Sequence, residues 1–354
     1  MPIFRFCTAA VNHPSCGVLR WRGCIIDSPA LQTPPFPQLS TSSVLCRQEI
    51  TARTTSLLRH LSMAQPTPCT PAPWRSEFLS HVSSIPQATF VLATLHPAKP
   101  DATHPFTVVP RARTCVFRGL WGTLPTSDWN PAPRNPPIYE SDLPVLTTDI
   151  RMEKAAEILG TASGSFPISG SGGGGPVEGV WWAEKHSTQW RIRGAAWVLG
   201  PDIDGDSAGA KAAREVLQKR MRNAGGGGAS LDRREEPQSA AESAWNWSRE
   251  VTGHFGNLSP VMRGTFRSPP PGKPVETPFL PGLGLGQTVE DVEDQVAREN
   301  FRVLVVVPDE VDQVDLSDPK NPKRRLYVYR GASYKSTQLG GEIDGEWEKV
   351  EVWP

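Results

Sequence analysis

Three arginines surround a short β-prone segment in the first half of the chain. Arg111, Arg113 and Arg118 fall within P-R-A-R-T-C-V-F-R-G, residues 110–119. A guanidinium group can bind a phosphate or a carboxylate through two parallel hydrogen bonds. The spacing therefore indicates a strand that holds an anion at its rim. Arginines that only face water at a strand end would give the same pattern, and such exposed charges contribute little.

The segment between these arginines has the composition of a half-buried strand. Because side chains alternate along a strand, Arg113 and Cys115 are expected on one face and Thr114 and Val116 on the other. The charged residues then lie at the two ends of a buried centre. This arrangement can present guanidinium groups to a bound anion.

A second segment that could meet the same anion follows shortly after. P-V-L-T-T-D, residues 144–149, is predicted as a strand, and R-M-E-K-A-A-E-I-L, residues 151–159, is strongly helical. Thr147 and Thr148 therefore lie just before a helix start, where backbone N–H groups attract anions. An anion held by Arg113 is expected to contact this turn as well.

The composition sets limits on the fold and on the partners. The chain has 354 residues, of which 38% are hydrophobic, and it contains 36 prolines and 31 glycines. We therefore expect roughly 200 residues of folded domain, with tails and insertions around it. Lys plus Arg equals Asp plus Glu at 37 each, so the overall charge favours neither nucleic acid nor an anionic membrane as a partner. Any anion site must be local.

Cysteine usage and hydropathy indicate a soluble protein without a metal site. The six cysteines form no C-x-x-C pair, and no histidine falls at metal-ligand spacing from a cysteine. No apolar run approaches the roughly 18 residues needed to span a membrane. Residues 1–62 are rich in arginine and poor in acids, like a transit peptide, but we favour translation from Met63, with an upstream stretch that is untranslated or disordered. The predicted location is cytoplasmic, or mitochondrial if residues 1–62 are a real presequence.

The periodicity of apolar residues predicts many strands and few helices. In residues 188–199, Gln189, Arg191 and Arg193 share one face and Trp190 and Ile192 the other. Two Gly-rich stretches read as flexible insertions, at residues 161–176 and 205–243. Seven or more strands favour an antiparallel barrel over alternating β-α units. One helix is expected to start at Pro73, and others are expected over 151–159, 208–221 and 288–300. The expected strands are 88–95, a strand from Arg113 onward, 144–149, 177–184, 188–199, 301–307, 311–316, 324–329 and 346–353.

Two other motifs are set aside on spacing. Gly205 to Gly209 fits G-x-S-x-G, but residues 201–204 separate it from the preceding strand, whereas a nucleophile elbow follows its strand directly. Asp202, Asp204 and Asp206 resemble the start of a calcium loop that lacks its glycine and its final glutamate. Both are expected to be turns.

Four motifs occur in the order seen in the FMN-binding split-barrel family, and the chain resembles its pyridoxamine 5'-phosphate oxidase-like branch. The motifs are R-A-R-T-C-V-F-R-G, L-T-T-D-I-R-M-E-K, S-T-Q-W-R-I-R-G and R-R-L-Y-V-Y. The resemblance covers residues 73–200 and 245–354. It implies a mainly β (α+β) fold, an antiparallel six-stranded split β-barrel with flanking helices, over residues 73–354 after an N-terminal extension of residues 1–72. It also implies a homodimer with FMN at the interface.

The resemblance implies a set of binding residues and no metal ligand. Arg118 replaces the substrate-binding lysine of the oxidases, and Arg263 is assigned to the substrate region. No catalytic residue is assigned, and the substrate is expected to be a small molecule that can bear a phosphate. The implied FMN-binding residues are Arg113, Thr114, Cys115, Val116, Thr147, Thr148, Arg151, Lys154, Gln189 and Arg324.

Departures from the family pattern leave the activity open. Met152 and Glu153 stand where the oxidases have Ser and Arg, and Leu316 stands near the place of a flavin-contacting Trp. The resemblance implies an FMN-dependent oxidoreductase. A flavin-binding module without turnover, or a dimeric scaffold that has lost FMN, remains the alternative.

Overall fold

The computed structural model describes residues 70–101, 105–164, 166–224, 245–331, 334, 337 and 339–354. All of them lie in one compact unit, residues 64–354. The expectations for residues 1–62, and for residues 225–243 of the second Gly-rich insertion, fall outside the described residues. The described part of that insertion, residues 205–224, contains the helix Ala208–Gln218 and is not an unstructured linker. Among the described residues, no helix is long and apolar enough to cross a membrane.

The chain enters the fold through a short helix whose apolar side is buried. Helix α2 (Arg75–Ser83) buries Phe78 and Val82, and Trp74 at its N-cap is also fully buried. Phe78 meets both Trp181 and Trp190 edge-on, with ring centroids 5.2 and 5.6 Å apart. These aromatic contacts fix α2 against the main sheet.

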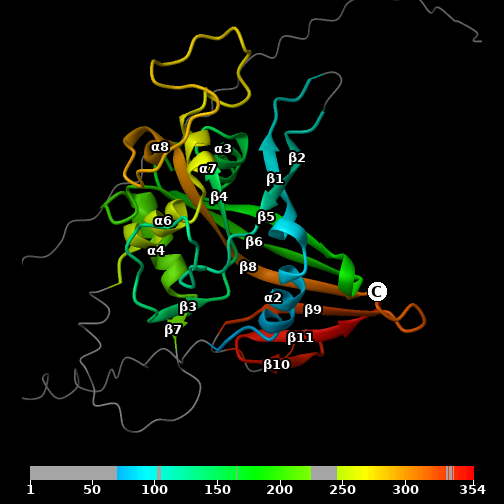
Figure 1. Ribbon diagram of the computed structural model, residues 1–354. Coiled ribbons are helices and arrows are strands. Elements are labelled where there is room, and N and C mark those ends of the chain that lie inside the picture. Colours follow the sequence, from blue (N-terminus) through cyan, green and yellow to red (C-terminus); the bar gives the residue numbers. More distant parts are fainter. Residues whose placement is uncertain are drawn as a thin grey trace, which may run out of the picture. The chain divides into compact units, whose positions relative to one another are not determined.

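The strands form one large, antiparallel sheet (Figure 1). Its order is β10-β11-β9-β8-β6-β5-β1-β2, with β4 also paired to β8. The bounds are β1 Thr89–Pro97, β2 Val108–Val116, β4 Val145–Asp149, β5 Gly172–Ala183, β6 Thr188–Leu199, β8 Phe301–Asp315, β9 Lys323–Tyr329, β10 Glu342–Asp344 and β11 Trp347–Val352. A second sheet pairs β3 (Tyr139–Ser141) with β7 (Met221–Asn223).

Strand β8 is the centre of this sheet. From Val303 to its end it pairs with β6, while on its other side residues 301–305 pair with β4 and residues 310–315 with β9. Every residue of the first half, Phe301 to Val307, is buried. All of them are apolar except Arg302. This strand therefore joins parts of the chain that are far apart in sequence.

The helices lie mostly on one side of the long strands. Figure 1 shows α4, α6, α7 and α8 gathered there, whereas α2 lies beside β9 and β11. The helix bounds are α3 Glu153–Gly160, α4 Ala208–Gln218, α6 Trp247–Gly256, α7 Pro260–Gly264 and α8 Gln295–Asn300, with 3-10 turns at Pro86–Ala88, Glu184–His186 and Thr265–Arg267. Two buried apolar clusters fill the space between helices and sheet.

The mainly β, antiparallel prediction is confirmed, but the count of six strands is wrong. The main sheet has nine strands, because the C-terminal segments add β9, β10 and β11 beyond β8. The ladders between the described strands do not close into a barrel. Backbone hydrogen bonds do join the segment after β2 to β4: Arg118 N donates to Val145 O at 2.8 Å and Val145 N to Gly119 O at 2.9 Å.

Three further expectations need correction. The glycines from Gly172 to Gly175 are not a flexible insertion but the start of β5, since Gly173 and Gly175 lie so close to neighbouring carbonyls that a side chain would clash. Residues 301–316 form one strand with a bulge, not two. The helix expected over 288–300 is only α8, because residues 288–294 are irregular, with a single turn at 292–293.

Candidate functional site

Arg113 lies on the inner face of β2, and residues of β1 and α3 hold its guanidinium group. Its Nη2 donates to Oε2 of Glu157 at 2.7 Å, and its Nη1 donates to Oγ1 of Thr94. The Glu157 carboxylate is only 2% exposed, and it also accepts from Thr94 at 2.5 Å and lies 2.9 Å from Nδ1 of His96. Part of the Arg113 charge is therefore already balanced inside the protein.

Glu157 is ionised in this cluster. Burial raises the pKa of its carboxyl, but the hydrogen bonds from Thr94 and His96 and the charge of Arg113 outweigh burial and lower it. A carboxylate so placed orients the guanidinium group of Arg113. It also competes with any anion that Arg113 would bind.

Lys154 supplies a second cation one turn before Glu157 on α3. Its Nζ donates to Oγ1 of Thr148 at 2.9 Å, and among the described residues no carboxylate lies within ion-pair distance of it. Burial lowers the pKa of Lys154, and the charge of Arg113 acts in the same direction. The amine thus keeps donors for an anion that reaches the end of β4.

The thiol of Cys115 completes the cluster. It is buried, and burial raises its pKa although Lys154 and Arg113 oppose this. The structure therefore brings Arg113, Cys115, Thr148 and Lys154 together. Thr147, next to Thr148, is half-buried on the other side of β4.

Arg151 is in a different position from the one that a phosphate ligand needs. Its guanidinium group binds both carboxylate oxygens of Asp149, and it donates to the carbonyls of Ser268 and Phe266. These four bonds use its donors to connect β4 with the turn after α7. Only one N–H, on Nη1, is left to replace the serine and arginine missing at residues 152 and 153.

The remaining residues of the expected cofactor site lie on the outer face of the sheet. Thr114 and Val116 alternate with the inward Cys115, as predicted, and Thr114 is exposed. Gln189 is half-buried on β6, and its side-chain amide has no hydrogen-bond partner among the described residues. Gln189 is separated from β2 by two strands, β1 and β5, so the sheet spacing puts it about 14 Å away across the sheet.

Arg324 also belongs to this outer face, but it is paired. Its Nε and Nη2 bind the two oxygens of Asp312 at 3.0 and 2.8 Å, and Arg191 binds the same carboxylate. Burial raises the pKa of Asp312, and the hydrogen bonds and charges of the two arginines lower it by more. This triad links β6, β8 and β9.

Arg118 lines a separate cavity of about 380 Å³ between the loop after β2 and α6. The wall of this cavity, which we call the Arg118 cavity, includes Phe117, Pro125, Ser127, His254 and Asn257. Arg263 does not line it. That side chain is 1% exposed, and its Nη1 donates to the carbonyl of Glu290 at 2.9 Å. The two residues assigned to the substrate are therefore in different surroundings.

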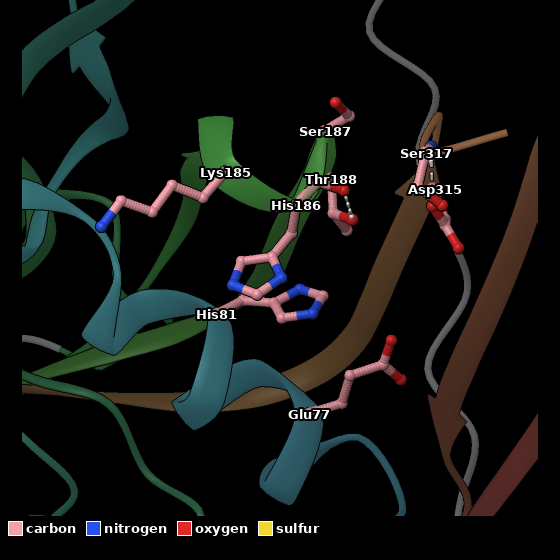
Figure 2. A pocket seen from close by; sticks show the side chains of 8 residues that line it. All are labelled: Glu77, His81, Lys185, His186, Ser187, Thr188, Asp315 and Ser317. Carbon is pink, nitrogen blue, oxygen red and sulfur yellow. Dashed lines mark hydrogen bonds between the residues drawn. The ribbon is translucent and has the colours of Figure 1, made fainter. Parts of the chain in front are cut away.

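A second cavity, of about 360 Å³, lies where α2 meets the turn between β5 and β6 (Figure 2). The rings of His81 and His186 stack there with centroids 4.0 Å apart, and Trp190 Nε1 donates to Nδ1 of His81 at 3.1 Å. Burial and the neighbouring His186 lower the pKa of His81. Figure 2 shows Glu77 and Asp315 at its edge, away from the stacked rings. In the described part of the chain, no three acidic, histidine or cysteine side chains are placed to bind a metal ion.

The two motifs that were set aside on spacing have structural roles. Ser207 is the N-cap of α4, and its hydroxyl accepts from Ala210 N at 3.1 Å. Asp202 accepts from the backbone and hydroxyl of Ser171. Both contacts stabilise the turn between β6 and α4.

The sequence reasoning missed Glu157 and His254. Glu157 lies within the predicted helix 151–159. In sequence it looks like a solvent-facing glutamate, although the structure buries it next to the buried Ile158 and Leu159. His254 is fully buried and stacks on Trp121 with the ring planes at 11°. Its one sequence signal is an aromatic-rich helical stretch in which apolar positions surround the histidine.

Comparison with known proteins identifies part of the chain. Residues 71–200 match the family model described as "Pyridoxamine 5'-phosphate oxidase, FMN-binding domain". The resemblance read from the motifs is confirmed for these residues. No curated protein matches the chain.

Two solved structures are similar in part. One is a pyridoxamine 5'-phosphate oxidase-related, FMN-binding protein from Nostoc punctiforme PCC 73102, with 18% identity, a TM-score of 0.42, and coverage of 80% of this chain and 100% of that one. The other is PhzG from Burkholderia lata 383 in complex with tetrahydrophenazine-1-carboxylic acid, with 13% identity, a TM-score of 0.28, and coverage of 85% of this chain and 92% of that one. Both TM-scores are below 0.5, so we base no inference on them.

Proposed function

We propose that this chain, whose residues 71–200 match the FMN-binding domain of pyridoxamine 5'-phosphate oxidase, is an FMN-binding flavoprotein that oxidises or reduces a small molecule. The observation that carries the proposal is Lys154. It is a half-buried ammonium group beside Arg113, hydrogen-bonded to Thr148 and without a carboxylate partner among the described residues. Such a cation gains from binding a phosphate, since charge-assisted hydrogen bonds contribute roughly 1.5 to 3 kcal/mol each.

The residues around Lys154 fit the phosphate of FMN in part. Lys154 and the hydroxyl of Thr148 would hold the phosphate, and Arg113 would add charge that Glu157 partly balances; Thr147 faces the other side of β4 and does not join them. Arg151 and Arg324 do not join them, because their donors bind Asp149 and Asp312. Bound FMN would supply reversible transfer of two electrons and a proton. The free amide of Gln189 would donate to, or accept from, the flavin ring.

Two copies of the chain would bring these groups to one flavin. Arg113 and Lys154 lie on the inner side of the sheet at one end, whereas Gln189 lies on the outer face. The same outer face exposes apolar side chains on neighbouring strands, namely Val91, Leu95, Val108 and Trp182, which are 39–49% exposed. Adjacent exposed apolar side chains of this kind favour a protein contact. We therefore propose a homodimer whose interface is the outer face of β1, β2 and β5.

The test is the flavin content of the purified full chain and of two lysine variants. The wild-type protein is expected to show visible flavin absorbance and to release FMN, identified by mass. Lys154→Met is expected to lose at least tenfold in FMN affinity. Lys219→Met removes an exposed lysine whose one ion-pair partner among the described residues is Glu215, so it should bind FMN like the wild type. A wild-type protein that takes up no added FMN would refute the proposal.

A dimeric scaffold without flavin is the second candidate, and one observation favours it. Arg113 and Arg151 both carry internal carboxylate partners, so the cluster can be stable without a bound phosphate. This candidate predicts a colourless dimer. The FMN titration described above separates the two proposals.

A further inference from the structure

Arg118 is a half-buried cation without an anionic partner among the described residues. Its side chain forms no hydrogen bond or ion pair with the described residues, and its Nε is buried and unpartnered. Burial lowers the pKa of Arg118, and no neighbouring acid opposes this shift. Buried guanidinium groups are normally paired, because an unpaired buried charge is costly. The Arg118 cavity beside it is where a ligand could supply the missing anion.

His254 adds a second polar group to the same cavity. The residue is 2% exposed, lines the cavity, and its Nε2 has no hydrogen-bond partner in the described part of the chain. Burial, together with the charge of Arg118, lowers the pKa of His254 to about 3. The imidazole is therefore neutral at physiological pH. It can share a hydrogen bond with a ligand but adds no positive charge.

The other walls of the cavity are neutral. Phe117 and Pro125 supply apolar surface, while Ser127 and Asn257 are polar and uncharged. The side chain of Asn257 already bonds to Pro125 O and to Asn130, and Ser127 donates to Asn257 O. Arg134 is nearby but exposed, and it donates to the carbonyls of Leu124 and Pro125. Arg118 is thus the single formal charge among the residues that line the cavity.

We propose that the Arg118 cavity binds the carboxylate group of a small organic acid, with Arg118 forming the ion pair and His254 the second hydrogen bond. This inference deepens the proposed function. The statement that the acid is the substrate rests on that function, whereas the carboxylate site itself does not. One guanidinium group matches one carboxylate in charge and in its planar, two-pronged geometry.

A phosphate ester suits this cavity less well. It carries close to two negative charges at neutral pH, and the cavity offers a single cation. The second charge would stay buried beside a neutral imidazole, which is unfavourable. The charge of the cavity therefore favours a monoanion. The neutral His254 is therefore a specificity-determining residue, because a cationic side chain at this position would favour the dianion.

The experiment is isothermal titration of the full chain at neutral pH with three probes of one shape, benzoate, phenyl phosphate and benzamide. The wild type is expected to bind benzoate with a dissociation constant of about 1 mM or below, and phenyl phosphate and benzamide at least tenfold more weakly. Arg118→Gln should lose at least tenfold in benzoate affinity, and Arg118→Lys should recover part of the loss. Arg111→Gln, which alters an exposed arginine of β2, is the matched control and should bind like the wild type.

The variant His254→Lys tests the specificity directly. It is expected to invert the preference, so that phenyl phosphate binds more tightly than benzoate; His254→Gln should keep the preference for benzoate. If wild-type protein binds phenyl phosphate more tightly, or if Arg118→Gln binds benzoate unchanged, the inference is wrong. Flavin content is measured on the same samples. Benzoate binding by a protein that takes up no FMN would refute the proposed flavin function and leave the carboxylate site standing.

Discussion

Arg113 and Glu157 are 44 positions apart in sequence, yet they form an ion pair of 2.7 Å at the end of the main sheet. The carboxylate is almost completely buried, and the guanidinium side chain is 22% exposed. The charge of each residue therefore limits what the other can bind. Arg113 is both a candidate phosphate ligand and the counter-ion of a buried acid.

We predict that Arg113→Ala destabilises the protein even when no flavin is present. The substitution leaves the Glu157 carboxylate buried without its cation, and breaking such a pair from one side costs about 3 kcal/mol. Denaturant unfolding of the flavin-free protein measures this change. The double variant Arg113→Gln with Glu157→Gln should recover most of the loss. If Arg113→Ala is as stable as the wild type, the ion pair is not a stabilising contact.

We also predict that Glu157→Gln binds FMN more tightly than the wild type. The amide keeps the hydrogen bonds with Thr94 and His96 but no longer competes for Arg113. An increase of several-fold in affinity, measured by flavin fluorescence titration, is expected from the freed charge. Glu215→Gln, at an exposed position of α4, is the control. Weaker binding in Glu157→Gln would mean that the carboxylate is needed to orient Arg113.

Acid should destabilise the protein through His254. Its pKa is about 3 in the folded state and 6.5 in the unfolded chain, so the unfolded state binds the proton first as the pH falls. The stability from this group is complete above pH 6.5 and declines below it, by about 1.4 kcal/mol per pH unit down to the folded pKa. Between pH 6.5 and pH 5 the loss is about 2 kcal/mol. His254→Gln should have a smaller slope over this interval in urea unfolding, and an unchanged slope would contradict the burial of a neutral imidazole.

If the outer face is the dimer interface, a single charge placed on it should convert the dimer to a monomer. Trp182→Glu puts a carboxylate among Val91 and Val180, where a partner chain would bury it. The elution volume and light scattering of the full chain should change from dimer to monomer, with loss of FMN affinity. Val261→Glu, at an exposed position of α7, should remain dimeric. A dimer of Trp182→Glu would place the interface elsewhere.

The glycine at the bulge between β6 and β8 should not tolerate a methyl group. A Cβ at Gly194 would lie 2.0 Å from the carbonyl oxygen of Val307, so the backbone must move. Gly194→Ala is therefore expected to lower the free energy of unfolding by about 2 kcal/mol or more. In Gly160→Ala nothing lies within 4 Å of the new Cβ, and this helical position should be neutral or slightly more stable. Equal stabilities of the two variants would contradict the close packing of β6 on β8.

Much of the framework could be predicted because it depends on local periodicity. The alternation of Gln189, Trp190, Arg191 and Ile192 predicts a strand with one buried face, and β6 has the predicted bounds. Leu92 and Phe90 in β1 follow the same rule. Glycines 172–175 were misread, because their composition is typical of a linker while their role is close approach to β6 and α3. Composition does not distinguish these two uses of glycine.

The candidate site was harder to predict, because it depends on which charges pair. Arg151 and Arg324 match the family pattern in type and position, but each binds an acid instead, Asp149 and Asp312 respectively. Arg118, in contrast, lies without a partner where a strand ends. Pairing between residues distant in sequence follows from the register of the sheet, and the register is not visible in a motif.

Strand β8 has a consequence for how the chain reaches this structure. The segment that matches the family model ends at residue 200, but β4 pairs only with β8 among the described strands, and β6, paired with β5 on one side, obtains its second neighbour from residues 301–315. During synthesis, their edges stay unpaired until about a hundred further residues have been made, and open edges invite aggregation. We therefore expect the segment recognised by its sequence to need residues 301–315 to cover the open edges of β4 and β6. Completion of the sheet then comes late in translation, and a chain truncated before residue 301 is expected to aggregate.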